Sequence, residues 1–447
     1  MKNFIQTLKN IWSIEDLRQR ILLTLGFILI FRIGSYVILP GVDVTVLDPT
    51  KGGGDSEGLA GLLDLFTGGA FNRASIFALG IMPYISASII MQLAGIAVPA
   101  IQKMQREGES GRKKITLYTR ILTVGVTLLQ APGYLSMSVI GNQAALNPDV
   151  LWWVTCVTIM VVGTLFVMWM GEKITDRGIG NGISLLIMIG IIAGLPGSYV
   201  QDFLKQTGEG GGGLMFVVVE LAILLLIIAA CVALVQATRR VPVQFAKRVV
   251  GNKQYGGVRQ YIPLKVNAAG VMPIIFAQAI MFVPLYLAQA MSVEPGTASF
   301  LNKLSDFKSL PYNIIFFILV VAFTYFYTAI TVNPNQMADD MKRQGGFIPG
   351  IKPGRKTADF LDTLLSRITL PGSIFLGLIA ILPAVASLFG IADGFAIFFG
   401  GTSLLIMVGV VLDTLQQIES HLLSRHYDGL MKSGKIKGRS STFGMAG

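Results

Sequence analysis

Charged residues are scarce in this chain. Asp, Glu, Lys and Arg make up 14% of its 447 residues, whereas 53% are hydrophobic. A soluble domain carries about 25% charged residues, so this composition excludes a soluble globular protein. The mean hydropathy of +0.65 predicts an all-α polytopic membrane protein, because helices satisfy their own backbone hydrogen bonds inside a bilayer.

Cysteine and histidine are also rare, with two of each. Cys156 and Cys231 lie inside apolar runs, where a free thiol behaves as a small hydrophobe. No disulfide framework is therefore expected. His421 and His426 lie near the C-terminus without a cysteine or acidic cluster around them, so neither a metal site nor a proton relay is expected.

Motifs for nucleotide chemistry are lacking as well. No Walker A sequence occurs, and the glycine run at 178–182 joins two apolar segments instead of a strand and a helix. Acidic residues well within the apolar segments are few, namely Glu220 and Asp413, although coupled carriers usually have such acids on their pathway. We expect no enzymatic activity and no cofactor, and the energy for any transport must come from outside the chain.

Long apolar runs are what the chain does have. A membrane-spanning helix needs about 20 mostly apolar residues, and ten segments meet this requirement. The segment 58–75, before the second span, is too polar and glycine-rich to cross. The predicted spans are 21–39, 76–98, 115–138, 151–171, 180–200, 214–236, 267–291, 312–332, 369–389 and 395–420.

Lysine and arginine are distributed very unequally between the loops. Alternate loops, starting with the N-terminal segment, hold 30 of the 36 basic residues, and the opposite loops hold four. The positive-inside rule therefore places both termini in the cytoplasm. The loop 237–266 has seven basic residues and no acidic one. This charge either reflects orientation alone or favours an anionic partner, such as lipid headgroups or nucleic-acid phosphate.

A short repeat suggests two related halves. The second span contains Gly80-Ile-Met-Pro83 and the seventh contains Gly270-Val-Met-Pro273. Proline-interrupted segments at matching positions of inverted repeats indicate a functional pathway; coincidence is the alternative. The predicted division is an amphipathic cytoplasmic segment (1–20), a first half (21–200), a second half (201–420) and a cytoplasmic tail (421–447).

Several motifs resemble those of the SecY/Sec61-alpha family of protein-conducting channels, in order along nearly the whole chain. They are FRIGSYVILPGVD (31–43), GGAFNRASIFALGIMPYISASIIMQL (68–93), EGESGRKKITLYTR (107–120), GEKITDRGIGNGISLLI (171–187), PLKVNAAGVMP (263–273), GFIPGIKPG (346–354) and FGGTSLLIMVGVVLD (399–413). The resemblance implies a two-halved clamshell of ten helices. It also implies a pore that passes unfolded secretory polypeptides, or releases membrane-protein helices laterally, at the bacterial cytoplasmic membrane.

The resemblance further implies a closed pore with two seals. A waist of aliphatic side chains would dewet and block ions, although isoleucines can equally serve ordinary helix packing. The segment 58–75 matches the family's plug. The implied waist residues are Ile81, Ile85, Ile187, Ile275 and Ile406, and the implied plug residues are Leu62, Leu63, Leu65, Phe66 and Arg73.

Side exit and docking are implied in the same way. Gln92 and Gln278 would be polar contacts of a lateral gate formed by the second, third, seventh and eighth spans. The implied docking residues are Arg239, Arg240, Lys247, Arg248, Lys253, Arg259, Lys352, Arg355 and Lys356. The implied partners are the SecE and SecG subunits, the SecA motor ATPase, the ribosome through its RNA phosphates, a nascent polypeptide with a signal sequence, and membrane lipids.

Two positions depart from the family pattern. Lys352 stands where arginine is usual, and Asn252 and Lys253 replace a common arginine pair. Lysine keeps the charge but lacks the bidentate hydrogen bonding of arginine. Arg259, Arg355 or Lys356 would therefore make part of the docking contacts. Besides a channel, the composition leaves open a transporter for a small solute and a membrane assembly scaffold. The scarcity of coupling acids argues against the transporter.

Overall fold

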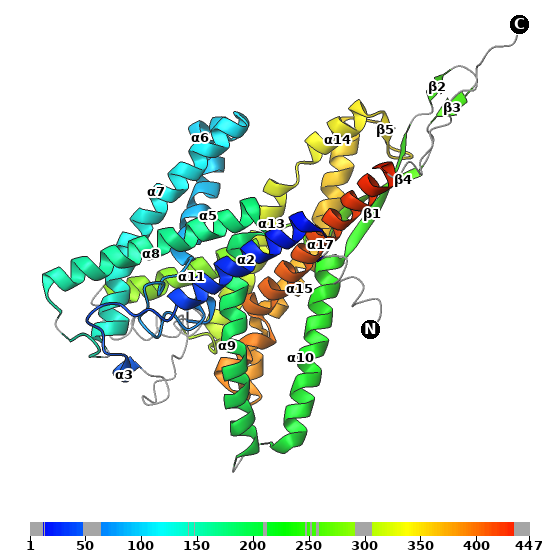
Figure 1. Ribbon diagram of the computed structural model, residues 1–447. Coiled ribbons are helices and arrows are strands. Elements are labelled where there is room, and N and C mark those ends of the chain that lie inside the picture. Colours follow the sequence, from blue (N-terminus) through cyan, green and yellow to red (C-terminus); the bar gives the residue numbers. More distant parts are fainter. Residues whose placement is uncertain are drawn as a thin grey trace, which may run out of the picture.

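The computed structural model describes residues 12, 14–47, 64–141, 143–146, 148–208, 212–245, 248–250, 253–255, 259–290 and 306–432. Long helices fill most of this part of the chain (Figure 1). In that view the strands β1 to β5 and the helices α6 and α14 lie at the upper end, and the hairpin of α9 and α10 reaches the lower end.

A helix coincides with each of the ten predicted spans, which confirms the helical fold. The first half contains α2 (Glu15–Gly34), α5 (Met82–Ala97), α7 (Glu109–Tyr134), α8 (Val150–Arg177) and α9 (Gly182–Thr207). The second half contains α10 (Gly213–Gln236), α11 (Met272–Ala290), α13 (Leu310–Thr331), α15 (Arg355–Leu388) and α17 (Gly401–Lys432).

Not every span passes a test of length and apolarity alone. In the described ranges seven helical segments do, and α5 with the bent α6 makes an eighth. The helix α2 carries Arg18, Arg20 and Arg32 near its ends. Such end positions let long basic side chains reach the interface, so the charge does not argue against a span. The remaining short elements are α3 (Val44–Leu47), α6 (Pro99–Arg106), the π-helix η1 (Leu135–Ile140), α14 (Pro334–Arg343), α16 (Asp393–Ala396) and the 3-10 helix η2 (Ile397–Phe399).

The repeated glycine–proline signature forms the same structure in both halves. Gly80 and Gly270 have φ angles of 52° and 64°, which only glycine adopts readily. Pro83 and Pro273 then lie at the second residue of α5 and α11. The expectation that these prolines interrupt the helices is wrong. Proline lacks an N–H that the first helical turn does not need, so each proline starts its helix.

The second half carries a small antiparallel sheet outside the helices. The strands β4 (Arg259–Lys265), β1 (Thr238–Phe245) and β5 (Gly346–Phe347) lie in the order β4-β1-β5. Thr238 pairs with Lys265, and Gln244 pairs with both Arg259 and Phe347. A second pair joins β2 (Arg248–Val250) to β3 (Lys253–Tyr255). The sheet therefore joins the two basic loops 237–266 and 333–368.

The two halves are also held together at the loop between α8 and α9. The backbone N–H of Gly180 donates to Gln417 Oε1 on α17, at 2.9 Å. On the other side of the loop, Thr24 of α2 accepts from the N–H of Ile179 at 3.2 Å. Because α2 and α9 belong to the first half and α17 to the second, this loop links the halves through hydrogen bonds.

Candidate functional site: an isoleucine constriction between the two halves

Four of the five predicted waist residues line one cavity. Ile85 comes from α5, Ile187 from α9, Ile275 from α11 and Ile406 from α17, and together they border a volume of about 370 Å³. Each half thus contributes two helices. Ile81 precedes α5 and is buried in the main hydrophobic cluster beside this cavity. The chain brings together side chains that are far apart in sequence, and all of them are the same residue type.

The cavity has an apolar wall with few polar groups. Val126 and Gln130 of α7 and Phe323 of α13 extend the lining to the neighbouring helices. The cavity therefore lies between the α5–α7 pair and the α11–α13 pair. Phe66 and Thr67, which precede α5 in the chain, border it as well.

The two predicted polar gate contacts do not meet in this lining. Gln278 of α11 borders the cavity and is itself buried. Gln92 is absent from the lining, and its amide Nε2 donates to Ser88 Oγ one turn earlier on α5, at 3.3 Å. Only Gln278 is therefore placed to contact anything in the cavity.

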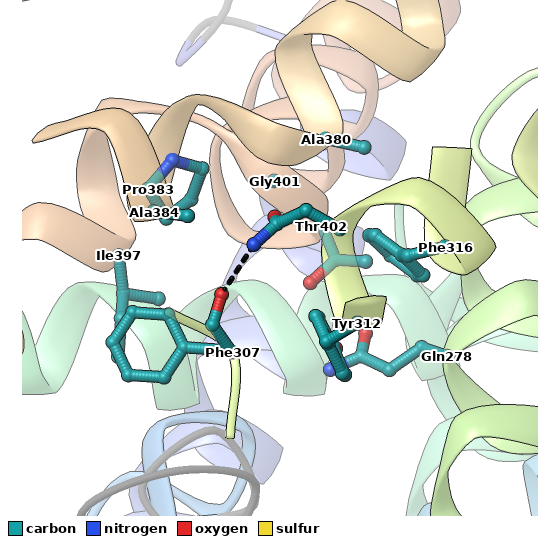
Figure 2. A pocket seen from close by; sticks show the side chains of 11 residues that line it. Gln278, Phe307, Tyr312, Phe316, Ala380, Pro383, Ala384, Ile397, Gly401 and Thr402 are labelled. Atoms are coloured by element: carbon teal, nitrogen blue, oxygen red, sulfur yellow. Dashed lines mark hydrogen bonds between the residues drawn. The ribbon is translucent and has the colours of Figure 1, made fainter. Parts of the chain in front are cut away.

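Gln278 also borders a second, small pocket of about 30 Å³, shown in Figure 2. Tyr312 and Asn313 of α13 and Thr402 of α17 line it too. Asn313 Nδ2 donates to the carbonyl of Phe307 at 2.8 Å, the dashed line in the figure. Gln278 thus lies where α11, α13 and α17 meet and borders both this small pocket and the isoleucine cavity.

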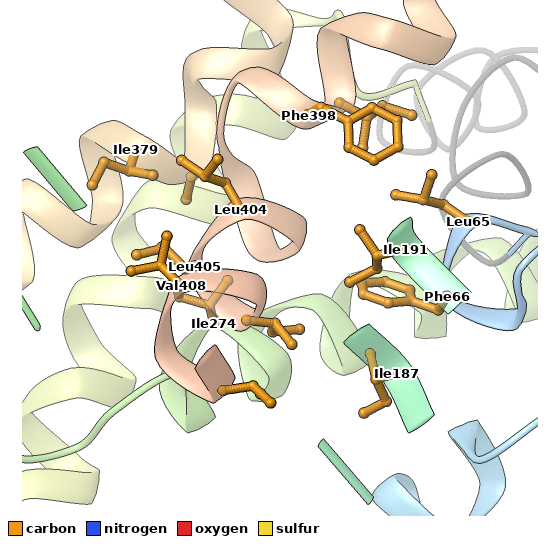
Figure 3. Packing of buried hydrophobic residues seen from close by; sticks show 14 of the residues in the cluster. Leu65, Phe66, Ile187, Ile191, Ile274, Ile379, Phe398, Leu404, Leu405 and Val408 are labelled. Atoms are coloured by element: carbon orange, nitrogen blue, oxygen red, sulfur yellow. The ribbon is translucent and has the colours of Figure 1, made fainter. Parts of the chain in front are cut away.

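Residues 64–75, the described part of the predicted plug and here called the plug segment, border the cavity through Phe66, Thr67 and Phe71. Leu65 and Phe66 are buried against Ile191 of α9 (Figure 3). Gly190 allows this close approach, since a Cβ at that position would overlap the carbonyl oxygen of Phe66. Leu62 and Leu63, also predicted here, lie outside the described residues.

Polar contacts hold the plug segment in its turn. Gly68 and Gly69 have φ angles of 67° and 85°, and the turn they form follows the helical residues 64–67. Asp64 Oδ1 accepts from the N–H of Asn72 at 2.9 Å, which closes the turn. The guanidinium of Arg73 lies 4.4 Å from the centre of the Tyr36 ring.

Burial raises the pKa of the Asp64 carboxyl, while the Asn72 N–H and the nearby Arg73 lower it by less. The folded protein therefore binds this proton more tightly than the unfolded chain does. The free energy of unfolding therefore decreases as pH rises from about 4 through the raised pKa of Asp64 in the folded protein. Above that pKa the full cost of the buried charge is present.

We therefore expect Asp64→Asn to raise the melting temperature at pH 7. The amide keeps an oxygen that accepts from Asn72 but carries no charge. The gain should shrink as pH falls through the raised folded pKa of Asp64 and vanish below about 4, where the carboxyl is neutral in both the folded and the unfolded protein. Thermal unfolding of the purified protein across this pH range is the measurement, with the exposed Asp359→Asn as a control that leaves the curve unchanged. Equal melting temperatures for Asp64→Asn and wild type at pH 7 would contradict the expectation.

Several of the predicted docking residues lie on the three-stranded sheet or in the loop that contributes β5 to it. Arg239 and Arg240 are exposed on β1, and Lys352, Arg355 and Lys356 are exposed at and before the start of α15. The pairing of Gln244 with Phe347 joins their two loops. Arg248, Lys253 and Arg259 begin β2, β3 and β4, whereas Lys247 and Asn252 lie outside the described residues.

Sequence reasoning assigned no role to Arg32, which contacts the plug segment. Its Nη1 donates to the carbonyl of Gly68 at 2.7 Å. The signal available was a lone arginine at the end of an apolar run, beside the aromatic residue of FRIGSY. This pattern alone could not predict that Arg32 contacts Gly68, 36 residues further along the chain.

Three comparisons with known proteins agree. Residues 75–415 match the family model SecY. The protein translocase subunit SecY of Streptomyces scabiei is 44% identical over 432 residues, which cover 93% of this chain and 97% of the relative. That of Mycobacterium tuberculosis is 43% identical over 448 residues, 96% and 99% of the two chains.

Solved structures share the fold at low sequence identity. A chain from the structure of a protein conducting channel has a TM-score of 0.63 at 16% identity and covers 92% of this chain and 94% of its own. A structure concerning the plug domain of SecY gives a TM-score of 0.60 at 17% identity over the same shares. Sec61 in a canine ribosome–channel complex gives 0.59 at 16%, again over 92% and 94%.

Proposed function

The chain belongs to the SecY family, and on that premise we propose how its residues work as a protein-conducting channel. Unfolded secretory polypeptides pass between the two halves, and membrane-protein helices leave sideways into the bilayer. The observation that carries the proposal is the single cavity lined by isoleucines from both halves and bordered by the plug segment. Family membership does not favour a carrier for a small solute.

Isoleucine suits both states of such a pore. At rest, a narrow aliphatic constriction sheds water, so ions cannot cross it. During passage, Ile85, Ile187, Ile275 and Ile406 can repack around an extended chain of any sequence, because apolar contact has no directional requirement. Ile81 would add to the same ring at the start of α5. A polar side chain here would hold water and let ions through.

The lateral exit is proposed between the α5–α7 pair and the α11–α13 pair. Apolar side chains from all four helices border the cavity, so a signal sequence could leave the ring without crossing a charged surface. Gln278 is the proposed polar contact of this gate, and Gln92 would join it only when the helices move. The plug segment, with Leu65, Phe66 and Arg73, closes the resting pore.

The proposed setting is the bacterial cytoplasmic membrane, with both termini in the cytoplasm and SecE and SecG as companion subunits. A ribosome or the SecA motor would push the polypeptide. The structures of related channels bound to ribosomes support a ribosome as one partner. The exposed basic side chains around β1 and the start of α15 are the proposed contact, because they suit RNA phosphates or an acidic motor surface.

We expect Lys352→Glu to reduce motor-driven export severalfold. Reversing an exposed charge replaces an attraction with a repulsion, and each such contact contributes about 0.2–1 kcal/mol. The Thr357 hydroxyl donates to the Lys352 carbonyl, a backbone contact that the substitution leaves in place. The measurement is the fraction of a precursor protected from protease in vesicles with motor and ATP. Lys352→Arg is the matched control and should export at least as well as the wild type; full export by Lys352→Glu would place docking elsewhere.

The same assay tests the function itself. Vesicles containing the chain and its companion subunits should protect a secretory precursor only when motor and ATP are present. If no precursor is protected under these conditions, the chain does not conduct polypeptides.

A further inference from the structure

Arg32 is the one basic side chain of α2 placed against the plug segment. It lies two residues before the end of the helix and is partly buried. Its two terminal nitrogens make separate hydrogen bonds. Nη1 donates to the carbonyl oxygen of Gly68 at 2.7 Å, and Nη2 donates to the hydroxyl of Tyr36 at 3.1 Å.

Two guanidinium groups lie close to the ring of Tyr36. The carbon Cζ of Arg32 is 5.0 Å from the centre of the ring, and that of Arg73 is 4.4 Å from it. Both distances are within the range of a cation–π contact. The ring therefore contacts Arg32 of α2 and Arg73 of the plug segment at the same time.

The carbonyl that Arg32 binds belongs to the tightest part of the segment. Gly68 lies close to both Arg32 and Gly190 of α9, so that a Cβ at this position would lie 3.0 Å from an atom of each. The hydrogen bond from Arg32 and the close contact with α9 are therefore made by the same residue of the docked segment.

We propose that Arg32 is the positioning residue that holds the plug segment docked against α9, and that Tyr36 fixes the orientation of its guanidinium. This inference rests on the proposed role of the segment as a plug. It names a control element on α2, a helix outside both the constriction and the lateral gate. The strength of this contact sets how readily an arriving polypeptide displaces the segment.

Arginine is suited to this task because its planar fork presents donors in two fixed directions. Lysine has one nitrogen on a flexible stem and cannot hold the Gly68 carbonyl and the Tyr36 hydroxyl in the same geometry. A hydrogen bond from a charged donor to a partly buried acceptor contributes enough to change the docked-to-undocked ratio by on the order of tenfold.

The test measures undocking directly with Leu65→Cys as a reporter. Leu65 is buried when the segment is docked, and both native cysteines are buried, so background labelling by a membrane-impermeant maleimide should be low. Adding Arg32→Lys should raise the labelling rate at residue 65 about tenfold. Tyr36→Phe, which keeps the ring but removes the hydroxyl, should raise it by less. Arg18→Lys, at the opposite end of α2, should leave it unchanged.

Resting ion conductance and export of a precursor with an inactive signal sequence are the second readout. The conductance and the export should both rise more in Arg32→Lys than in Tyr36→Phe, as the labelling rates do. Tyr36→Phe is the milder change, so it still tests the proposal if Arg32→Lys fails to fold. Wild-type labelling and conductance in both variants would overturn the role of Arg32.

A chain lacking residues 58–67 separates the proposed plug role from the proposed role of Arg32. If the deletion raises conductance and Arg32→Lys does not, the segment is a plug but Arg32 does not position it. If the deletion leaves conductance unchanged, both the plug role and the positioning role are contradicted.

Discussion

Replacing Ile85 and Ile275 with serine raises the resting ion conductance of the reconstituted channel. These two side chains face the same cavity from opposite halves, so each serine places a hydroxyl where the constriction must stay dry. A buried hydroxyl without a partner costs about 1–3 kcal/mol, and water entering the ring relieves that cost. Each substitution should therefore increase conductance by roughly tenfold.

Single-channel recording in planar bilayers measures the effect, without any precursor present. The matched control is Ile280→Ser, which borders the same cavity on the partly exposed face of α11 but is not one of the five proposed ring positions. Ile85→Leu and Ile275→Leu keep the ring apolar and should stay closed. If the double serine variant conducts no more than the wild type, Ile85 and Ile275 do not form the seal.

A second large effect is expected from Gly190→Ala. The added Cβ would overlap the carbonyl oxygen of Phe66 and lie 3.2 Å from the backbone nitrogen of Gly68. Backbone atoms cannot rotate away, so the plug segment must move off α9. Overpacking of this kind costs about 1–3 kcal/mol, which converts to roughly a 5- to 150-fold shift toward the undocked state.

Labelling of a cysteine at residue 65 reports this shift, and resting conductance should rise with it. Gly197 provides the control because it lies on the same helix with open space around it. Alanine there removes the helix cost of glycine, about 0.5–1 kcal/mol, so Gly197→Ala should be at least as stable as wild type and remain closed. Equal labelling in the two variants would show that the segment does not depend on close contact with Gly190.

The helical architecture could be predicted because each span carries its own signal. Runs of about 20 apolar residues and the unequal loop charges depend only on nearby sequence. The spacing of Ile81 and Ile85 predicts one helix face, but α5 begins at Met82 and only Ile85 borders the cavity. The meeting of Ile187, Ile275 and Ile406 with Ile85 depends on how helices from two halves pack, and here the resemblance to a known family supplied what periodicity could not.

Other features had no local signal. The hydrogen bond from Arg32 to Gly68 joins residues whose side chain and carbonyl meet only after folding. Pro83 predicts a break because proline disrupts a helix interior, whereas Gly80 turns the chain so that α5 begins just before the proline. The sheet that joins the two basic loops depends on the pairing of Gln244 with Phe347. No pattern in either loop predicts this pairing.

The hydrogen bond from Gly180 to Gln417 has a mechanical consequence when it is considered with the α9–α10 hairpin. The bond fixes the halves at one end of α9, and the hairpin fixes them at the other, where Gln206 Oε1 accepts from the N–H of Gly212 at 3.4 Å. Two fixed points define a rotation axis along α9. If the halves turned about this axis, displacement would grow in proportion to distance from it, so α5 and α11 would separate by more than α9 and α17. Such a rotation would open the side between the α5–α7 pair and the α11–α13 pair and leave the hydrogen bonds at the two ends of α9 intact.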